Sequence, residues 1–362
     1  MTTGRPGVPP CVVVTGGGTA GHVIPALPVV EALLEAGSSV HFVGSAKGLE
    51  ESLVAPLGIP FHGVQAGKLR RYFSFENFVD ALRIPVGIAQ AWRLLARIRP
   101  AVVFSKGGFV SFPVVVGAWL KGIPVVAHES DLTPGLANRL AQRFATTLCV
   151  NFEATRAERV KVVVTGTPLR RQLLNGDAVR GRERLGIDTE RPVLLVVGGS
   201  LGATRLNEAV RTALGRLLAD YDVIHVCGAG KMDASLGALG GYIQREYVSD
   251  DWGDIVAAAD LVVSRAGANA LNEWLTLGKP HLLVPLPRAA SRGDQIENAA
   301  HAQSRGWSMV LSEDALNSET LVAGVAKLAA LSGEFRQRMQ AFRRHDSTSL
   351  IVEELSKATL AR

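Results

Sequence analysis

The 362-residue sequence contains few cysteines, no cysteine pair with metal-ligand spacing, and no long apolar run. Cys11, Cys149 and Cys227 lie far apart in apolar segments, so we expect small buried residues in a reducing compartment. The first ten residues, MTTGRPGVPP, lack the apolar stretch of a secretory signal. The most apolar segment, Phe112 to Leu120, is shorter than the roughly 18 residues that cross a bilayer. These absences predict a cytosolic protein without a membrane span.

Acidic residues are outnumbered by basic ones, 33 to 39, which gives a net charge of +6 and a pI near 9.4. This excess favours an anionic partner such as a nucleic acid, a phospholipid or a diphosphate substrate. Hydrophobic residues make up 47% of the chain and the mean hydropathy is +0.19. A chain of this length and composition is expected to form two domains with substantial cores.

Short β-branched runs alternate with helix-length segments, a pattern that predicts parallel sheets with helical crossovers. A helix is expected over about residues 22–36, directly after the first strand. The pattern restarts near residue 192, so we predict an α/β protein with two Rossmann-like domains, 1–166 and 167–345, and a C-terminal helical stretch, 346–362, that packs back on the first domain. Strands are expected at 11–15, 40–44, 102–105, 124–128, 161–165, 192–197, 223–227, 261–264, 281–285 and 308–311.

Two glycine-rich loops follow the first strand of each predicted domain. Gly16, Gly18 and Gly21 satisfy GxGxxG, and the second loop covers residues 198–203. Such loops let backbone N–H groups approach a phosphate at a helix N-terminus, although each loop alone could be a tight turn. The end of the second strand, residues 41–45, has no acidic residue, and His22 stands where a P-loop has lysine, so dinucleotide and ATP chemistry are disfavoured. The paired loops favour a phosphate-bearing ligand.

Six motifs follow one another along the chain: TGGGTAGHVIPAL (15–27), SKGGFVSFP (105–113), HESDLTPGLANRLA (128–141), GTPLR (166–170), GGSLGA (198–203) and SRAGANALNEWLTLGKP (264–280). Together, in order over residues 11–345, they resemble the MurG family, the UDP-N-acetylglucosamine:muramyl-pentapeptide transferases of peptidoglycan synthesis. The resemblance implies the GT-B glycosyltransferase fold, with a cleft between two facing domains. It also implies a hexosyltransferase that inverts the anomeric centre while moving N-acetylglucosamine to the muramyl 4-hydroxyl of lipid I, giving lipid II.

The resemblance also implies which residues bind the donor. The carboxylate of Glu273 is expected to accept the ribose hydroxyls, and Gln295 to read the sugar hydroxyls. Asp131 takes the place of an asparagine, because many relatives have the sequence HEQN where this chain has HESD. At 166–168 this chain has Gly-Thr-Pro in place of Gly-Asn-Pro. The full donor set is Thr19, Ala20, Gly21, Asp131, Arg170, Ser200, Val248, Ala268, Asn269, Ala270, Leu271, Asn272, Glu273 and Gln295.

Transfer needs a base for the acceptor proton and positive charge for the departing UDP. His22 is the favoured base, with Glu129 and Asp131 as the competing carboxylates. The alternatives stay open: His22 could simply begin a helix, the carboxylates could cap the helix near Pro134, and Glu273 could be a solvated helix residue. Arg265 is expected to be structural. The acceptor diphosphate is expected to contact Gly17, Gly18, His22, Gly107 and Gly108.

No metal motif is evident, so no cofactor is expected to be required, although loosely bound Mg²⁺ could stimulate transfer. The expected partners are UDP-N-acetylglucosamine, the undecaprenyl-diphosphate-linked acceptor and an anionic membrane surface at the cytoplasmic face. Basic and large apolar residues mix over 68–99, which is typical of a peripheral membrane surface but also of a helix covering a core. Nucleic acid is not expected. Two other functions remain open: a GT-B enzyme with another lipid or natural-product acceptor, and a nucleotide-sugar-binding scaffold without turnover.

Overall fold

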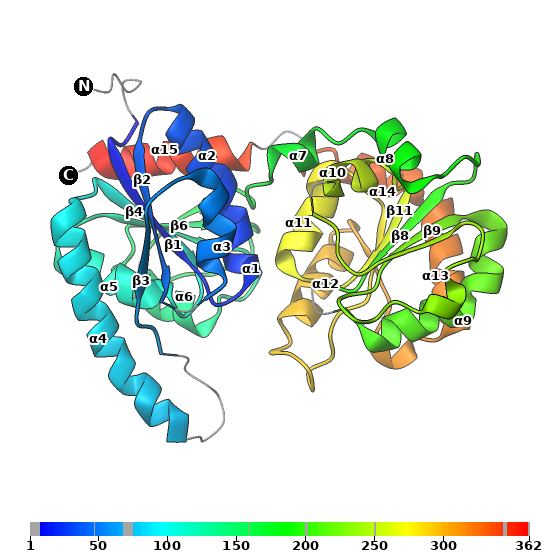
Figure 1. Ribbon diagram of the computed structural model, residues 1–362, viewed down its shortest axis with the longest axis horizontal. Helices are drawn as coiled ribbons and strands as arrows, with labels where there is room; N and C mark the ends of the chain where they lie inside the picture. The colour runs from blue at the N-terminus through cyan, green and yellow to red at the C-terminus, as the bar shows by residue number, and fades with distance from the viewer. Residues whose placement is uncertain are drawn as a thin grey trace. The chain divides into compact units, whose positions relative to one another are not determined.

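The computed structural model describes residues 8–46, 48–67, 75–158, 160–199, 202–249, 251–342 and 346–360. The chain forms two compact units (Figure 1). The first comprises Met1–Arg170 together with Asp346–Arg362, and the second comprises Arg171–His345. Each unit is built on one parallel β-sheet, which confirms the prediction of an α/β chain with two Rossmann-like domains.

The first sheet has seven strands in the order β3-β2-β1-β4-β5-β6-β7, and every neighbouring pair is parallel. The chain therefore starts in the middle of the sheet, moves to one edge, and crosses back after β3. The point of reversal lies between β1 and β4, where α/β proteins commonly bind ligands at the carboxyl ends of the strands. The strands are β1 (Cys11–Gly16), β2 (Ser39–Ser45), β3 (Phe61–Val64), β4 (Val102–Gly107), β5 (Val125–Glu129), β6 (Thr147–Val150) and β7 (Lys161–Val164).

Alternation along β1 divides the first core between the two faces of its sheet. Val12 and Val14 are fully buried in one cluster, and Val13 is fully buried in another. Because successive side chains of a strand point to opposite faces, both faces of this sheet are apolar and each is covered by helices. The helices of the first unit are α1 (Ala20–Val23), α2 (Leu27–Glu35), α3 (Glu50–Val54), α4 (Phe75–Ile98), α5 (Ser111–Leu120), α6 (Leu136–Ala141) and α15 (Ser347–Leu360).

The C-terminal helix α15 belongs to the first unit, although the whole second unit precedes it in the chain (Figure 1). Its Ile351 and Leu355 are fully buried in the same cluster as Val12 and Val14. Lys161 on β7 also forms a 2.7 Å ion pair with Glu354. The last helix thus completes one face of the first core.

The second sheet has the order β10-β9-β8-β11-β12-β13, again with parallel neighbours. Its strands are β8 (Val193–Val197), β9 (Asp222–Val226), β10 (Tyr242–Arg245), β11 (Leu261–Ser264), β12 (His281–Leu283) and β13 (Met309–Val310). Its helices are α7 (Arg171–Leu174), α8 (Ala178–Leu185), α9 (Thr204–Asp220), α10 (Trp252–Ala258), α11 (Ala268–Leu277), α12 (Asp294–Ser304), α13 (Ser318–Ala330) and α14 (Ser332–Met339).

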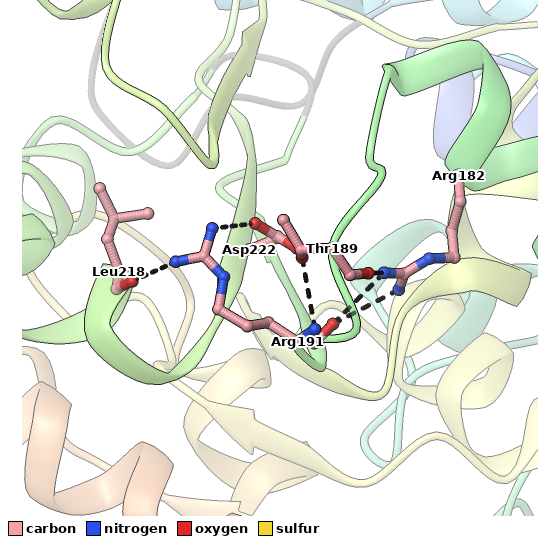
Figure 2. A network of polar contacts seen from close by, with 5 residues as sticks. All are labelled: Arg182, Thr189, Arg191, Leu218 and Asp222. Carbon is pink, nitrogen blue, oxygen red and sulfur yellow. Dashed lines mark hydrogen bonds and ion pairs between the residues drawn. The ribbon is translucent and has the colours of Figure 1, made fainter.

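A polar network fixes the amino ends of β8 and β9 (Figure 2). Nη2 of Arg191 lies 2.6 Å from Oδ1 of the buried Asp222 and a second guanidinium nitrogen donates to the carbonyl of Leu218. Thr189 donates to the same carboxylate, while Arg182 donates to the carbonyls of Thr189 and Arg191. Ligand loops follow the opposite, carboxyl ends of these strands, so this network is structural.

Several boundaries differ from those expected. The helix expected over 22–36 begins at Ala20 and is divided into α1, a 3-10 turn and α2, because Pro25 and Pro28 cannot donate the backbone hydrogen bonds of a continuous helix. The strands β3, β6 and β10 were not predicted. All three cysteines are free; Cys149 and Cys227 are buried as expected, whereas Cys11 is half-buried. Across the described ranges, no helix is both long and apolar enough to cross a membrane.

Candidate active site

The first glycine loop leaves β1 at Gly16 and enters α1 at Ala20. Gly18 has φ of +88°, a conformation that a residue with a side chain rarely adopts. The N–H of Gly17 donates to the carbonyl of Gly107 over 3.3 Å, and the N–H of Gly18 donates to Glu50 over 2.7 Å. The predicted phosphate loop is therefore fixed by two contacts from other parts of the sheet edge.

Glu50 is a component of the site that the sequence did not reveal. It lies in α3 with 1% of its surface exposed. Its carboxylate accepts the N–H of Gly18 and, over 2.9 Å, the hydroxyl of Ser45 at the end of β2. A Cβ atom at Gly17 would lie 2.2 Å from the same carboxylate, so the loop needs glycine there. A buried acid that orders a glycine loop has no motif of its own.

His22 is half-buried in α1, directly beside the first loop. Its Nδ1 lies 2.9 Å from the hydroxyl of Thr19, which fixes the orientation of the imidazole ring. A Cβ atom at Gly108 would lie 3.4 Å from Cγ of His22 and 2.1 Å from the carbonyl oxygen of Gly17. The structure therefore brings together the residues predicted for the acceptor diphosphate, namely Gly17, Gly18, His22, Gly107 and Gly108.

The carboxylate of Glu129, at the end of β5, holds the loop that follows it. One oxygen accepts the N–H of Asp131 over 3.0 Å, and the other accepts Nδ2 of Asn138 over 2.8 Å and the N–H of Gly135 over 3.2 Å. Burial raises the pKa of Glu129, and the neighbouring Asp131 adds to the rise. With three N–H donors on its oxygens, Glu129 has the contacts of a loop anchor. Asp131 is less buried than Glu129.

Lys106, at the end of β4, is the second site component that the sequence did not reveal. Its side chain is 1% exposed, and Nζ donates to the hydroxyl of Ser130 over 2.6 Å. Burial lowers the pKa of Lys106 to about 8, while the carboxylates of Glu129 and Asp131 act in the opposite direction. The motif SKGGFVSFP contains this lysine, but periodicity alone cannot show that its charge is buried.

The second glycine loop follows β8 in the second unit. Gly199 and Gly202 have φ of +86° and +66°. A Cβ atom at Gly202 would lie 2.1 Å from the carbonyl oxygen of Cys227, so this loop passes close to the chain after β9. Ser200, predicted to contact the donor diphosphate, lies outside the described residues. Helix α9 starts at Thr204 immediately after the loop.

The predicted nucleotide segment, 268–273, forms the first turns of α11. Ala268, Leu271 and Asn272 are buried, so their side chains face the second core. Asn269, Ala270 and Glu273 are partly exposed. The helix therefore offers a donor the side chains of one face and the backbone of its first turn.

Arg265, before α11, has the structural role that the sequence predicts. Its guanidinium donates to the carbonyl of Val284 over 3.1 Å and pairs with the buried Glu313. Gln295 in α12 accepts the N–H of Leu286 over 3.1 Å. Arg170 and Val248 are partly exposed, the first at the end of the first unit and the second in the loop after β10.

Comparison with known protein families gives two matches that together include most of the chain. Residues 12–150 match the glycosyltransferase family 28 N-terminal domain, and residues 193–353 match the C-terminal domain of the same family. The two matched segments lie in the two units, and the second extends into α15.

Curated relatives are similar over nearly the whole chain. A protein of Legionella pneumophila (strain Paris) is 48% identical over 346 residues, which cover 95% of each chain. A protein of Lachnospira eligens is 49% identical over 343 residues, which cover 94% of this chain and 97% of the relative. Both carry the name UDP-N-acetylglucosamine--N-acetylmuramyl-(pentapeptide) pyrophosphoryl-undecaprenol N-acetylglucosamine transferase.

Solved structures share the architecture. The crystal structure of Acinetobacter baumannii MurG aligns with a TM-score of 0.76 and 27% identity, covering 96% of this chain and all of that one. A glycosyltransferase of kitacinnamycin aligns with a TM-score of 0.74 at 17% identity, covering 97% of this chain and 99% of that one. At that identity the second likeness concerns the fold alone.

Proposed function

The chain belongs to glycosyltransferase family 28, and on that basis we propose that it is a hexosyltransferase acting on a lipid-linked acceptor. It moves N-acetylglucosamine from UDP-N-acetylglucosamine to the muramyl 4-hydroxyl of lipid I, the undecaprenyl-diphosphate-linked muramyl-pentapeptide, and so makes lipid II for peptidoglycan. The observation that carries this proposal is the 48% identity over 95% of both chains to a relative named for that reaction.

The glycine loops divide the chemistry between the two GT-B domains. The loops after β1 and β4 of the first unit offer His22 and the backbone of Gly107 and Gly108 to the acceptor, whereas the N–H groups of Gly17 and Gly18 already donate within the unit. The loop before α9 offers the donor a helix N-terminus. The first turns of α11 offer the side-chain amide of Asn269 and the carboxylate of Glu273. The acceptor 4-hydroxyl attacks the anomeric carbon as its bond to the UDP oxygen breaks, and the configuration inverts.

His22 is the base in this proposal. Thr19 fixes its Nδ1, whereas both oxygens of Glu129 already accept loop N–H groups. The imidazole takes the proton of the acceptor hydroxyl as the new bond forms. The growing charge on the UDP diphosphate is met by Arg170 and by the N-terminus of α9, which presents about half a positive charge.

No tightly bound metal is needed in this mechanism, because protein groups neutralise the leaving diphosphate. Loosely bound Mg²⁺ acts only as a stimulant through the diphosphate. A chelator added to the purified enzyme is therefore expected to reduce the rate partially. A complete loss of activity that Mg²⁺ restores would contradict this part of the proposal.

We also propose that the first unit docks peripherally on the cytoplasmic face of an anionic membrane. Exposed basic and apolar side chains lie together along α4 and at the end of α5. Nζ of Lys121 lies 3.8 Å from the Trp92 ring centroid, which places a cation on an exposed aromatic side chain. Residues 68–74 of the predicted membrane segment lie outside the described residues. The exposed side chains are Arg83, Val86, Trp92, Arg93, Trp119 and Leu120.

A coupled assay tests the proposed reaction. UDP release is measured from UDP-N-acetylglucosamine with a short-chain lipid I analogue, and from UDP-glucose as the control donor. Release that requires both correct substrates supports the transferase. Release with a natural-product acceptor instead would favour another GT-B enzyme, and binding without release would favour a scaffold. Calorimetry that found equal affinity for ADP and UDP would contradict the donor assignment.

A further inference from the structure

The side chain of Lys106 connects the first glycine loop to the loop that follows β5. A Cβ atom at Gly16 would lie 3.1 Å from Cβ of Lys106. The buried ammonium at the end of the same side chain donates to Ser130. Among the described residues, Nζ of Lys106 has one hydrogen-bond acceptor, the hydroxyl of Ser130. A buried cation with one neutral acceptor needs another source of stabilisation.

Two carboxylates supply that stabilisation. Glu129 and Asp131 flank Ser130 in the chain, and both favour the charged form of Lys106. Lys106 in turn favours the charged form of Glu129, against the effects of burial and of Asp131. His128, which precedes Glu129 in the chain, has its pKa lowered by burial and by Lys106. Its Nε2 donates to the carbonyl of Gly166 over 2.8 Å, a contact that favours the charged form, but burial and Lys106 have the larger, opposite effect on its pKa.

Buried hydrogen bonds also hold Ser130 in place, and Ser130 connects the Lys106 ammonium to the loop after β5. Nδ2 of Asn151 donates to the Ser130 carbonyl over 2.9 Å, and the Thr167 hydroxyl donates to Oδ1 of Asn151 over 2.8 Å. The hydroxyls of Ser130 and Thr167 lie 3.5 Å apart. Ser130 is thereby held at its carbonyl by Asn151 and at its hydroxyl by Lys106.

We propose that Lys106 is a positioning residue of the transfer site, whose buried charge holds Ser130 and balances the carboxylates of Glu129 and Asp131 on either side of it. This inference rests on the proposed function for its catalytic consequence. It assigns to Lys106 a role that neither the glycine loops nor the predicted base supply. Without the ammonium, the buried carboxylate of Glu129 would face the repulsion of Asp131 without the positive charge of Lys106.

The first experiment measures the pH dependence of kcat/KM for the acceptor in Lys106→Met, which keeps the length of the side chain and removes its charge. We expect kcat/KM to fall at least tenfold at neutral pH and its acidic limb to become steeper. A neighbouring opposite charge shifts a carboxyl pKa by roughly one to three units, so its loss adds the protonation of a carboxyl group to that of His22. Lys327→Met, at an exposed lysine of the second unit, is the matched control. An acidic limb with the wild-type slope would overturn the proposal.

A thermal double-mutant cycle tests the charge balance without any substrate, and so separates it from a failure of the transferase assignment. We expect Lys106→Met to lower the melting temperature and the added Asp131→Asn to restore part of that loss, because it removes one of the two carboxylates that Lys106 balances. Strictly additive shifts would overturn the charge balance. If Lys106→Met does not fold, a folded Lys106→Met/Asp131→Asn variant supports the proposal, whereas an unfolded one beside a folded Asp131→Asn overturns it.

Discussion

The imidazole of His22 and the hydroxyl of Thr19 form a pair at the mouth of the first glycine loop. Replacing His22 by Ala is expected to leave UDP affinity nearly unchanged. If His22 is the base, kcat should fall by roughly 10²- to 10⁴-fold, the factor that general-base catalysis contributes. The acidic limb of the pH–rate profile should also disappear. Steady-state kinetics from about pH 5.5 to 9, with circular dichroism as the folding control, makes the measurement.

A different outcome would identify a different role for His22. If the imidazole only positions the acceptor diphosphate, the acceptor KM rises and the pH profile keeps its shape, because the proton then leaves to a carboxylate. Values of kcat and KM close to those of the wild type would remove His22 from the site.

The carboxylate of Glu50 is expected to order the first glycine loop. Glu50→Ala leaves the buried N–H of Gly18 without an acceptor, a loss of about 1–3 kcal/mol. The acceptor KM should therefore rise and the melting temperature should fall. Glu51→Ala, at the exposed neighbouring position in α3, is the matched control. Equal effects of the two substitutions would show that Glu50 does not order the loop.

His225, on β9, predicts a pH dependence of stability. Nδ1 accepts from the hydroxyl of Tyr242 over 2.8 Å and Nε2 donates to Oδ1 of Asn207 over 3.0 Å. Burial, with a smaller effect of Arg211, lowers its pKa to about 3. Because the unfolded chain, with a histidine pKa near 6.5, binds the proton more readily, stability is lost as the pH falls from about 6.5 towards 3, by up to about 1.4 kcal/mol per pH unit.

The measurement for His225 is urea unfolding at several pH values between about 7.5 and 5, the window in which this residue begins to protonate in the unfolded chain. His225→Gln cannot titrate, so its free energy of unfolding should fall less steeply with decreasing pH than that of the wild type. Parallel slopes for the two proteins would show that His225 is not the group that links acid to unfolding of the second unit.

At the scale of elements, the sequence predicted the central strands because they are apolar on both faces, as in Val193–Val197. It did not predict β3, β6 and β10, each four residues long. Phe61–Val64 contains a histidine and a glycine, and its first three residues are only partly buried or exposed. Pairing with β2, rather than local propensity, makes this segment a strand.

The candidate site was also only partly predictable, because some of its features depend on tertiary structure. Glycines at the ends of β1, β4 and β8 were visible in the sequence because a close approach or a positive φ excludes side chains. Glu50 and Lys106 were not, because a charged residue near a turn usually lies in water and only the tertiary structure shows that these two are buried.

Helix α15 is expected to stabilise the first unit strongly, although it follows the second unit in the chain. Ile351→Ala removes a fully buried side chain from the core beneath α2, and such changes cost about 2–5 kcal/mol. Leu360→Ala, at a position 77% exposed in the same helix, is the control and should change stability by less than about 0.5 kcal/mol. Chemical denaturation measures both, and similar losses would show that α15 is not part of this core.

At the scale of the whole molecule, the net charge of +6 combines with exposed tryptophans on the first unit. We expect the protein to sediment with anionic liposomes at low salt and to leave them at high salt, because a basic surface attracts anionic lipid over a Debye length of only about 10 Å at 0.1 M salt. Liposomes of neutral lipid should bind much less protein. If binding is absent or insensitive to salt, the alternative is favoured, in which α4 covers the core and does not bind a membrane.

Substitutions then separate the charges of this surface from its apolar groups. Replacing Arg70, Arg71 and Arg83 by Ala should reduce binding at low salt, since each basic residue near the surface contributes roughly 1 kcal/mol of attraction. Trp119→Ala, at a side chain 53% exposed, should lower the binding that persists at moderate salt. A matched triple replacement of exposed arginines in the second unit, at 184, 216 and 305, should leave sedimentation unchanged. An equal loss in this control would mean that total charge, rather than the first unit's surface, recruits the protein to the membrane.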